Sequence, residues 1–181
     1  RYPDAGYRAN LGDRDGVLKK CTAPNHWDWP GITFDTLHPS RWLPYLGNIS
    51  SCVVSMGTAG GRVLLSGDIS EVIESRLIRE GIPPHRLLLV PHHGSTTSSS
   101  PAFIARLQPE IAIATASLGN RFDFPRPEIR ARYEAAGAQF WSTGDCGALR
   151  VVLHPDGTMQ AASARRQRKR AWRWPAAENC P

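Results

Sequence analysis

The chain has 181 residues, enough for one domain of ordinary size, and its hydrophobic share of 41% fits a soluble globular domain with a modest core. It contains no run of 18 or more apolar residues, which excludes a transmembrane helix. Its start at Arg1 resembles neither a signal peptide nor an initiator methionine, so we expect a fragment or an excised domain. The formal net charge is +6, but residues 165–181 hold six basic residues against Glu178, a net +5, so the remainder is nearly neutral.

The first third of the chain predicts loops and antiparallel strands. Residues 1–30 are rich in Gly, Pro, Asp, Asn and Trp without periodicity, so we predict a loop there. Residues 32–37 alternate apolar and polar side chains, which is typical of a half-buried strand. After a loop over 40–48, the β-rich runs 51–56 and 62–65 flank a glycine-rich turn and predict a hairpin.

The remainder predicts alternating helices and strands. Helices are predicted over residues 70–80, 101–107 and 127–137, because apolar residues recur at helical spacing, proline starts the later two and glycine ends the first and third. Strands are predicted over residues 87–90, 111–115, 139–142 and 148–153. Together these elements predict an α/β fold (α+β, with a mixed sheet) layered with helices.

The predicted strand ends carry the chemistry-bearing residues. Asp68, His92 and Ser117 each follow an apolar strand, the place where sites collect in α/β sheets. An acid after a buried strand must pair, cap or ligate, and an N-cap for the following helix explains Asp68 equally well.

The Pro-His-His-Gly-Ser motif at residues 91–95 is the sharpest local signal. A lone histidine is usually structural, but two adjacent imidazoles after a buried strand favour a site. If the extended backbone persists, His92 and His93 point to opposite faces, so only one of them faces a given site.

The four cysteines, Cys21, Cys52, Cys146 and Cys180, are far apart and show no zinc-binding spacing. Cys52 precedes an apolar run, where we expect a buried thiol. An oxidising compartment would allow disulfides, and the sequence does not pair the cysteines.

The basic tail has two interpretations. It is either a solvated terminal segment or a surface that binds phosphate backbones with strong salt dependence, its tryptophans stacking on bases. The candidate nucleic-acid-binding residues are Arg165, Arg166, Arg168, Lys169, Arg170 and Trp172.

Several segments together resemble the C-terminal domain of ComEC-type DNA-uptake proteins. The resemblance covers about residues 20–155, and its specific part is the combination of Ser-Gly-Asp at 66–68 with Pro-His-His-Gly-Ser at 91–95. Its remaining parts are residues 27–32, 37–39, 48–54, 97–100, 119–122 and 143–148, together with Glu71 and Glu74. On this basis we divide the chain into a loop-rich remnant (1–30), the C-terminal part of the domain (31–160) and a basic tail (161–181).

The resemblance implies part of a metallo-β-lactamase-like αββα sandwich that binds one or two divalent metals, Mn or Zn and conceivably Mg. It implies a metal-dependent DNA phosphodiesterase acting in natural transformation. DNA and a membrane channel domain of the same polypeptide would be the partners, with no small-molecule cofactor. The parent protein would lie in the bacterial inner membrane, with this domain on the periplasmic side.

In that scheme Asp68 bridges two metals and His92 is a ligand. His93 or Ser95 orients the phosphate or protonates the leaving oxygen, and Asn120 is a further catalytic candidate. His92 is favoured as the ligand because it lies nearer the rigid strand. Asn48 stands where many relatives have a metal histidine, which favours an oxygen-rich site.

Two departures from the family pattern leave the enzymatic assignment open. No Asp-x-Asp-His string occurs, so we expect the main ligand motif upstream of Arg1 and the 181 residues alone to be inactive. Phe124 occupies the place of the family's histidine in Asn-Arg-Phe/Tyr-x-His-Pro, and phenylalanine neither ligates a metal nor moves a proton. The alternatives are a catalytically impaired DNA-guiding module and a small-molecule metallo-hydrolase.

Overall fold

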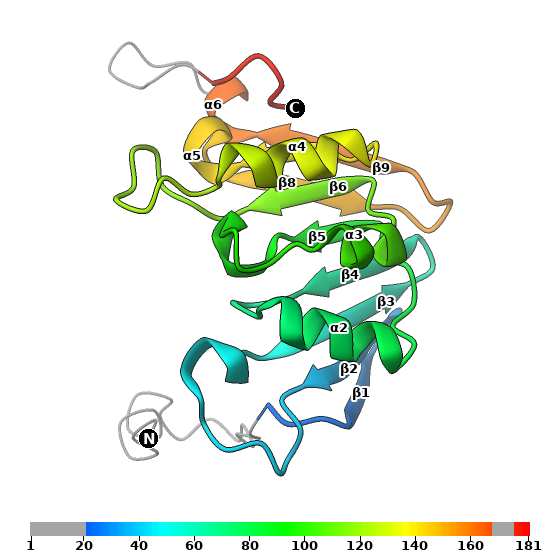
Figure 1. Cartoon of the computed structure of the whole chain (residues 1–181). Coiled ribbons are helices and arrows are strands. Elements are labelled where there is room, and N and C mark those ends of the chain that lie inside the picture. Colours follow the sequence, from blue (N-terminus) through cyan, green and yellow to red (C-terminus); the bar gives the residue numbers. More distant parts are fainter. Residues whose placement is uncertain (1–20, 168–175) are drawn as a thin grey trace, which may run out of the picture.

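The computed structural model describes residues 21–167 and 176–181, and its centre is a seven-stranded mixed sheet (Figure 1). The strands follow chain order across the sheet from β1 to β7, antiparallel from β1 to β4 and parallel from β4 to β7. The predicted α/β class with a mixed sheet is confirmed.

The antiparallel half consists of two successive hairpins. Its strands are β1 (Asn25–Trp29), β2 (Ile32–His38), β3 (Val53–Thr58) and β4 (Gly61–Leu65). The prediction of a loop over residues 1–30 is wrong for β1, which pairs with β2 in register Trp27 to Phe34. The Trp27 and Phe34 rings stack with centroids 4.9 Å apart. A contact between two strands leaves no pattern in the sequence of either strand alone, so the sequence did not predict β1.

The parallel half alternates strands with helices close to the predicted bounds. The strands are β5 (Leu87–Leu89), β6 (Ile111–Ala114) and β7 (Gln139–Ser142), and the helices are α2 (Glu71–Arg79), α3 (Pro101–Leu107) and α4 (Pro127–Ala135). At the start of α3 the Ser100 hydroxyl accepts a hydrogen bond from the Phe103 N–H, and Pro101 occupies the first turn.

The two faces of the sheet are covered differently (Figure 1). On one face α2, α3 and α4 pack over Leu64, Leu88 and Ala112. On the other face the hairpin of β8 (Leu149–Leu153) and β9 (Met159–Ser163) packs over Leu87 and Ile111. Residues of the parallel strands alternate between the two cores, so these strands are apolar throughout. The strand β9 was not predicted.

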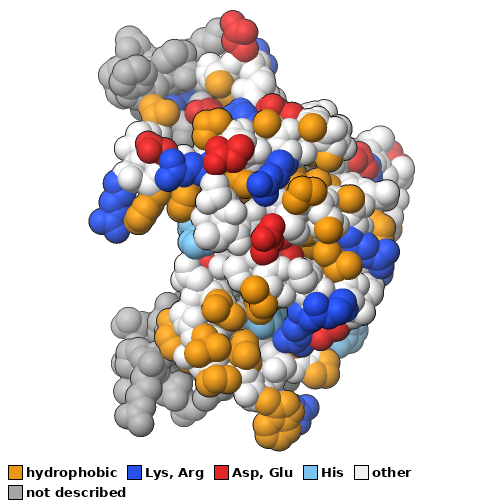
Figure 2. All heavy atoms as spheres, viewed as in Figure 1, with side chains coloured by type: hydrophobic (Ala, Val, Ile, Leu, Met, Phe, Trp, Pro, Cys, Tyr) orange, Lys and Arg blue, Asp and Glu red, His pale blue; other side chains and the backbone are white. Residues whose placement is uncertain are grey.

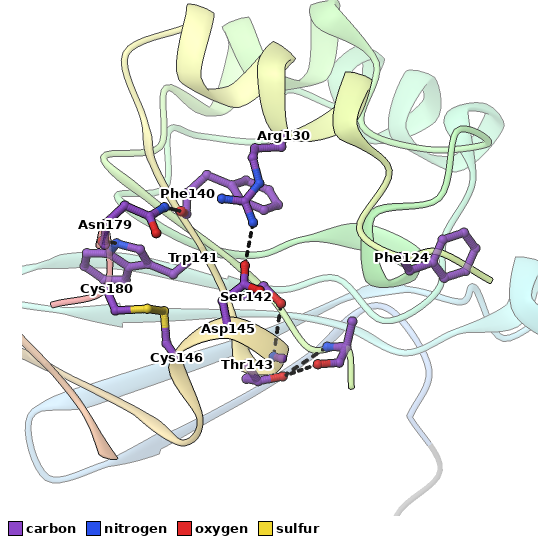
Figure 3. Close-up of polar contacts among 12 residues, drawn as sticks. Phe124, Arg130, Phe140, Trp141, Ser142, Thr143, Asp145, Cys146, Asn179 and Cys180 are labelled. Atoms are coloured by element: carbon purple, nitrogen blue, oxygen red, sulfur yellow. Dashed lines mark hydrogen bonds and ion pairs between the residues drawn. A yellow bond between two sulfur atoms is a disulfide. The ribbon is translucent and has the colours of Figure 1, made fainter. Parts of the chain in front are cut away.

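Both pairs of cysteines form disulfides, Cys21–Cys52 and Cys146–Cys180. The expectation of a buried Cys52 thiol is wrong, because Cys52 is exposed and bonded. Figure 3 shows how Cys146–Cys180 ties the end of the chain to the short helix α5 (Thr143–Cys146), which follows β7. The indole N–H of Trp141 on β7 donates to the Asn179 carbonyl at 2.9 Å. None of the helices within the described ranges has the length and apolar character needed to cross a lipid bilayer.

His85 is fully buried, and both ring nitrogens are hydrogen-bonded. The Nδ1 atom lies 2.7 Å from the Pro83 carbonyl, so it carries the proton, and Nε2 lies 2.8 Å from the Ser55 hydroxyl and accepts from it. Burial, the largest cause, lowers the pKa of His85 to about 4, so the folded state keeps this ring neutral.

Acid should therefore destabilise the fold through His85. Between about pH 6.5 and pH 4 the unfolded chain binds a proton at His85 that the folded chain does not, so stability is present above that window and falls as the pH is lowered through it. The free energy of unfolding should fall by about 3 kcal/mol across this window. Urea unfolding at pH 7 and pH 4 checks this, and His85→Gln should show a smaller pH response. The difference between the two proteins removes the contribution of Glu74, whose raised pKa acts in the opposite sense.

Candidate functional site

Two of the three residues predicted at strand ends, Asp68 and His92, lie at one edge of the sheet, whereas Ser117 lies in the loop after β6, where its carbonyl accepts from the Asn120 amide. Asp68 follows β4, the histidine pair follows β5 and Thr115 follows β6, and these three strands are parallel neighbours. The His92 N–H donates to the Gly67 carbonyl at 3.1 Å, which joins the first two loops directly. A cavity of about 940 Å³ opens beside them, and Asp68 and Asn48 are among the residues that line it.

The histidine pair lies in a tight turn, Pro91–Gly94, instead of an extended strand. The φ angles of His92 and His93 are 49° and 57°, in the left-handed region, and the Ser95 N–H closes the turn on the His92 carbonyl at 3.0 Å. The expectation that the two side chains alternate across a strand is therefore wrong. Left-handed backbone at two successive residues other than glycine is costly, and such conformations cluster at functional sites.

His93 faces Asp68. Its Nδ1 atom lies 2.7 Å from the Thr115 carbonyl, which only accepts, so Nδ1 must carry the proton. In the neutral ring Nε2 then holds a lone pair, and it lies 3.4 Å from the Asp68 Oδ1 atom. Two electron-pair donors thus face one another, an arrangement satisfied by a proton or a metal cation between them.

His92 contacts neutral partners. The Asn48 amide donates to its Nε2 atom across 3.2 Å, and its Nδ1 atom lies 3.2 Å from the Thr97 hydroxyl. The sequence analysis did not identify Thr97 or Thr115 as partners of the histidines, although Thr97 lies in the serine- and threonine-rich run over residues 95–100. Which histidine would bind a metal remains a prediction, but the contacts place His93, and not His92, beside Asp68.

Ser95 and Asn120, both catalytic candidates, have structural partners in this conformation. Ser95 is 5% exposed, and its hydroxyl lies 3.1 Å from the Thr97 hydroxyl. The Asn120 amide donates to the Ser117 and Phe124 carbonyls, and its oxygen accepts from the Phe122 and Phe124 N–H groups. Asn120 thus organises the loop that follows β6.

Glu74 fixes the loop that follows the histidine turn. Its buried carboxylate on α2 accepts the N–H groups of Ser99, at 2.5 Å, and Ser100, at 2.8 Å. Burial raises the pKa of Glu74, while these hydrogen bonds oppose the rise.

The basic tail is described only in part. The Arg166 guanidinium donates to the Cys180 carbonyl at 2.6 Å, and the Arg165 side chain packs beside Gly147. Arg168, Lys169, Arg170 and Trp172 lie outside the described residues.

Within residues 21–167 and 176–181, no group of three or more His, Cys, Asp and Glu side chains is arranged to hold a metal ion. The candidate metal ligands that lie together in the described residues are therefore Asp68 and His93, and His92 and Asn48 lie beside them.

Similar proteins come from several bacteria. The chain is 31% identical over 159 residues to the competence protein ComA of Neisseria gonorrhoeae, covering 87% of this chain and 23% of that protein. It is 33% identical over 139 residues to the uncharacterized protein YcaI of Escherichia coli, covering 76% and 18%. It is 29% identical over 149 residues to Recombination protein 2 of Haemophilus influenzae, covering 82% and 18%.

No protein-family model matches the chain. The chain spans less than a quarter of the length of these three relatives. These similarities support a competence-protein family for this chain, which aligns with one part of each of these proteins.

Proposed function

We propose that the chain contributes part of a divalent-metal site for phosphodiester hydrolysis of DNA, within a longer polypeptide that acts in DNA uptake. The observation that carries the proposal is the Asp68–His93 pair, in which a carboxylate oxygen and an imidazole lone pair face one another at 3.4 Å. The Thr115 carbonyl behind the ring fixes the tautomer that leaves Nε2 free of a proton. Histidines that ligate metals commonly donate their other N–H to a backbone carbonyl in this way.

The donor set fits a metal in part. Asp68 and His93 would supply one oxygen and one nitrogen, and catalytic metal sites use about three protein ligands. Mixed oxygen and imidazole donors suit manganese or zinc. When bound, such a metal would lower the pKa of a coordinated water and polarise a phosphoryl oxygen. The remaining ligands would come from elsewhere in the longer polypeptide, a proposal that fits the small share of the relatives that this chain spans.

The neighbouring residues would act on the substrate. Asn48 and His92 are hydrogen-bonded to one another, and Asn48 also lines the cavity beside Asp68. An amide and an imidazole at this place can donate to a phosphate oxygen or pass a proton to the leaving group. Since a relative is named a competence protein and another a recombination protein, DNA is the phosphodiester that we propose.

The disulfides bear on location. All four cysteines of the chain are paired, and disulfides persist in oxidising compartments. We therefore propose that the chain works outside the cytoplasm, attached to a membrane channel through its parent polypeptide. The fold that we propose is the C-terminal part of a metallo-β-lactamase-like sandwich.

Manganese titration by calorimetry tests the metal site. The 181-residue chain should bind Mn²⁺ weakly, because only two ligands are present, and both Asp68→Asn and His93→Ala should remove that binding. The matched control is Asp35→Asn, which alters the exposed His26–Asp35 contact at 2.7 Å. Binding that survives Asp68→Asn, or that disappears in Asp35→Asn, would contradict the proposed site.

A DNA-guiding module that does not cleave is the second candidate function. It is favoured by Phe124, which packs against His92 with ring centroids 5.9 Å apart where the family resemblance leads one to expect a histidine. DNA cleavage by the longer polypeptide distinguishes the two candidates. Cleavage that depends on both Mn²⁺ and Asp68 supports the hydrolase, and DNA binding without such cleavage supports the module.

A further inference from the structure

The loop after β6, residues 117–126, carries a row of stacked side chains that ends at the candidate site. The Arg121 guanidinium lies 4.6 Å from the centre of the Phe122 ring. The Phe122 and Phe124 rings stack with centroids 5.5 Å apart, and Phe124 meets the His92 ring edge-on. A guanidinium, two phenyl rings and an imidazole thus follow one another toward the edge where Asp68 and His93 meet.

The loop is built to hold this row in place. Asn120 makes four hydrogen bonds across it, two of them to the backbone of Phe124. The Arg126 N–H donates to the Gly94 carbonyl at 3.0 Å, which fixes the loop against the histidine turn. Just before the loop, the Thr143 hydroxyl donates to the Ala116 carbonyl at 2.9 Å and accepts from the Ala116 N–H at 3.0 Å (Figure 3). Because these hydrogen bonds fix the backbone of the loop, the two phenyl rings form a surface that exists before any ligand binds.

The outer part of this surface is accessible. Phe122 is 50% exposed, and so is Leu118 in the same loop. Figure 2 shows the loop projecting from the molecule with hydrophobic, basic and acidic side chains on it, and histidine side chains are visible in the notch below the loop. Arg126 is paired with Asp123 at 3.7 Å, which balances that carboxylate locally.

We infer that Arg121, Phe122 and Phe124 form a stacking platform for a nucleobase of single-stranded DNA, next to the site that holds the phosphate of the same strand. The exposed Arg121 guanidinium at the outer end of the row takes the base, and the two phenyl rings behind it hold the guanidinium in place. The inference rests on the proposed function and names the form of DNA that the site accepts. Every nucleobase has a flat π-face that stacks on aromatic rings, and arginine adds attraction to phosphate and to rings. A base paired within a duplex is already stacked on its neighbours, so the platform selects unpaired strands.

Binding of two oligonucleotides by the 181-residue chain tests the platform. The probes are a short oligothymidine and the same strand with abasic nucleotides, which keeps the phosphates and removes the bases. Fluorescence anisotropy in EDTA measures affinity without cleavage. We expect the native chain to prefer the intact strand by about 5- to 150-fold, the range typical of base–aromatic stacking. Phe122→Ala should lose most of that preference, and Phe122→Trp should keep it.

The comparison separates the platform from other sources of affinity. Contacts between basic residues and phosphates, including any made by the tail, are the same for both strands and cancel in the ratio. Stacking of tail tryptophans on bases would not cancel, so the contribution of the platform is the part of the preference that Phe122→Ala removes. Trp29→Ala is the control, because Trp29 is 62% exposed on β1, at the edge of the sheet farthest from β7. This variant should leave the preference unchanged.

Two results would overturn the inference. One is an undiminished preference for intact strands in Phe122→Ala, and the other is tighter binding of duplex than of single-stranded oligothymidine. The metal titration and the cleavage assay are independent of this ratio. A preference that depends on Phe122 in a protein that does not cleave DNA supports the platform and refutes only the hydrolase.

Discussion

Replacing His93 with alanine should deplete the proposed metal and lower the rate of DNA cleavage by at least about 10²-fold in the longer polypeptide. His93 is the imidazole that faces Asp68, and its Nδ1–H is committed to the Thr115 carbonyl. Removing it takes away one of the two donors that the described chain supplies. Metal content by mass spectrometry and cleavage of a labelled single strand give the two readouts.

His92→Ala should differ in kind. His92 is held by Asn48 and Thr97, so its loss should leave metal bound and slow only the chemical step, by about 10²- to 10⁴-fold. This assignment reverses the roles expected from sequence, where nearness to the strand favoured His92 as the ligand. Full metal occupancy in His93→Ala with depletion in His92→Ala would restore the sequence-based assignment, and normal cleavage by both variants would exclude a catalytic role for the motif.

Thr115→Val supplies a matched control for this pair. The Thr115 hydroxyl lies 3.1 Å from His93 Nδ1, but the closer partner is its backbone carbonyl, which valine retains. Valine also keeps the β-branched shape. Metal content and cleavage should therefore stay close to those of the native protein. A large loss would mean that the hydroxyl, and not the carbonyl, sets the orientation of His93.

The elements that sequence predicts well are those whose signals are local. Pro101 after Ser100 marks a helix start because both residues act through their own backbone and nearest turn. Asp68 and His92 were singled out because each follows an apolar strand, the place where sites collect in α/β sheets. The structure adds that β4, β5 and β6 are parallel neighbours, which brings Asp68 and the histidine pair to the same edge of the sheet.

The details that sequence does not predict depend on distant partners. β1 exists because Trp27 packs on Phe34 across a hairpin, and the pairing of Cys21 with Cys52 depends on where β3 begins. The left-handed histidine turn is the clearest case. Its conformation follows from the closure of the Ser95 N–H on His92 and from contact with Pro125, a residue of another loop. The sequence of the motif at residues 91–95 gives no information about its contact with Pro125, so the turn could not be predicted from it.

Replacing Gly94 with alanine should destabilise the fold by about 2–5 kcal/mol and abolish both metal binding and the preference for intact strands. Gly94 has φ of +88°, which costs about 1–2 kcal/mol for any residue with a side chain. A methyl group there would lie 2.6 Å from the Pro125 Cβ atom and 2.9 Å from its Cα atom. Since backbone lies in the way, the loop that carries Phe124 must move, and overpacking of this kind adds about 1–3 kcal/mol.

Gly137→Ala is the matched control, because Gly137 has φ of +87° but nothing within 4 Å of the added methyl group. It should lose only the conformational part, about 1–2 kcal/mol, and keep both binding activities. Urea unfolding monitored by circular dichroism gives the two stabilities, and their difference isolates the contact between the histidine turn and the loop after β6. Equal losses in the two variants would show that this contact is not tight, and the stacked row would then not be held against His92 as described.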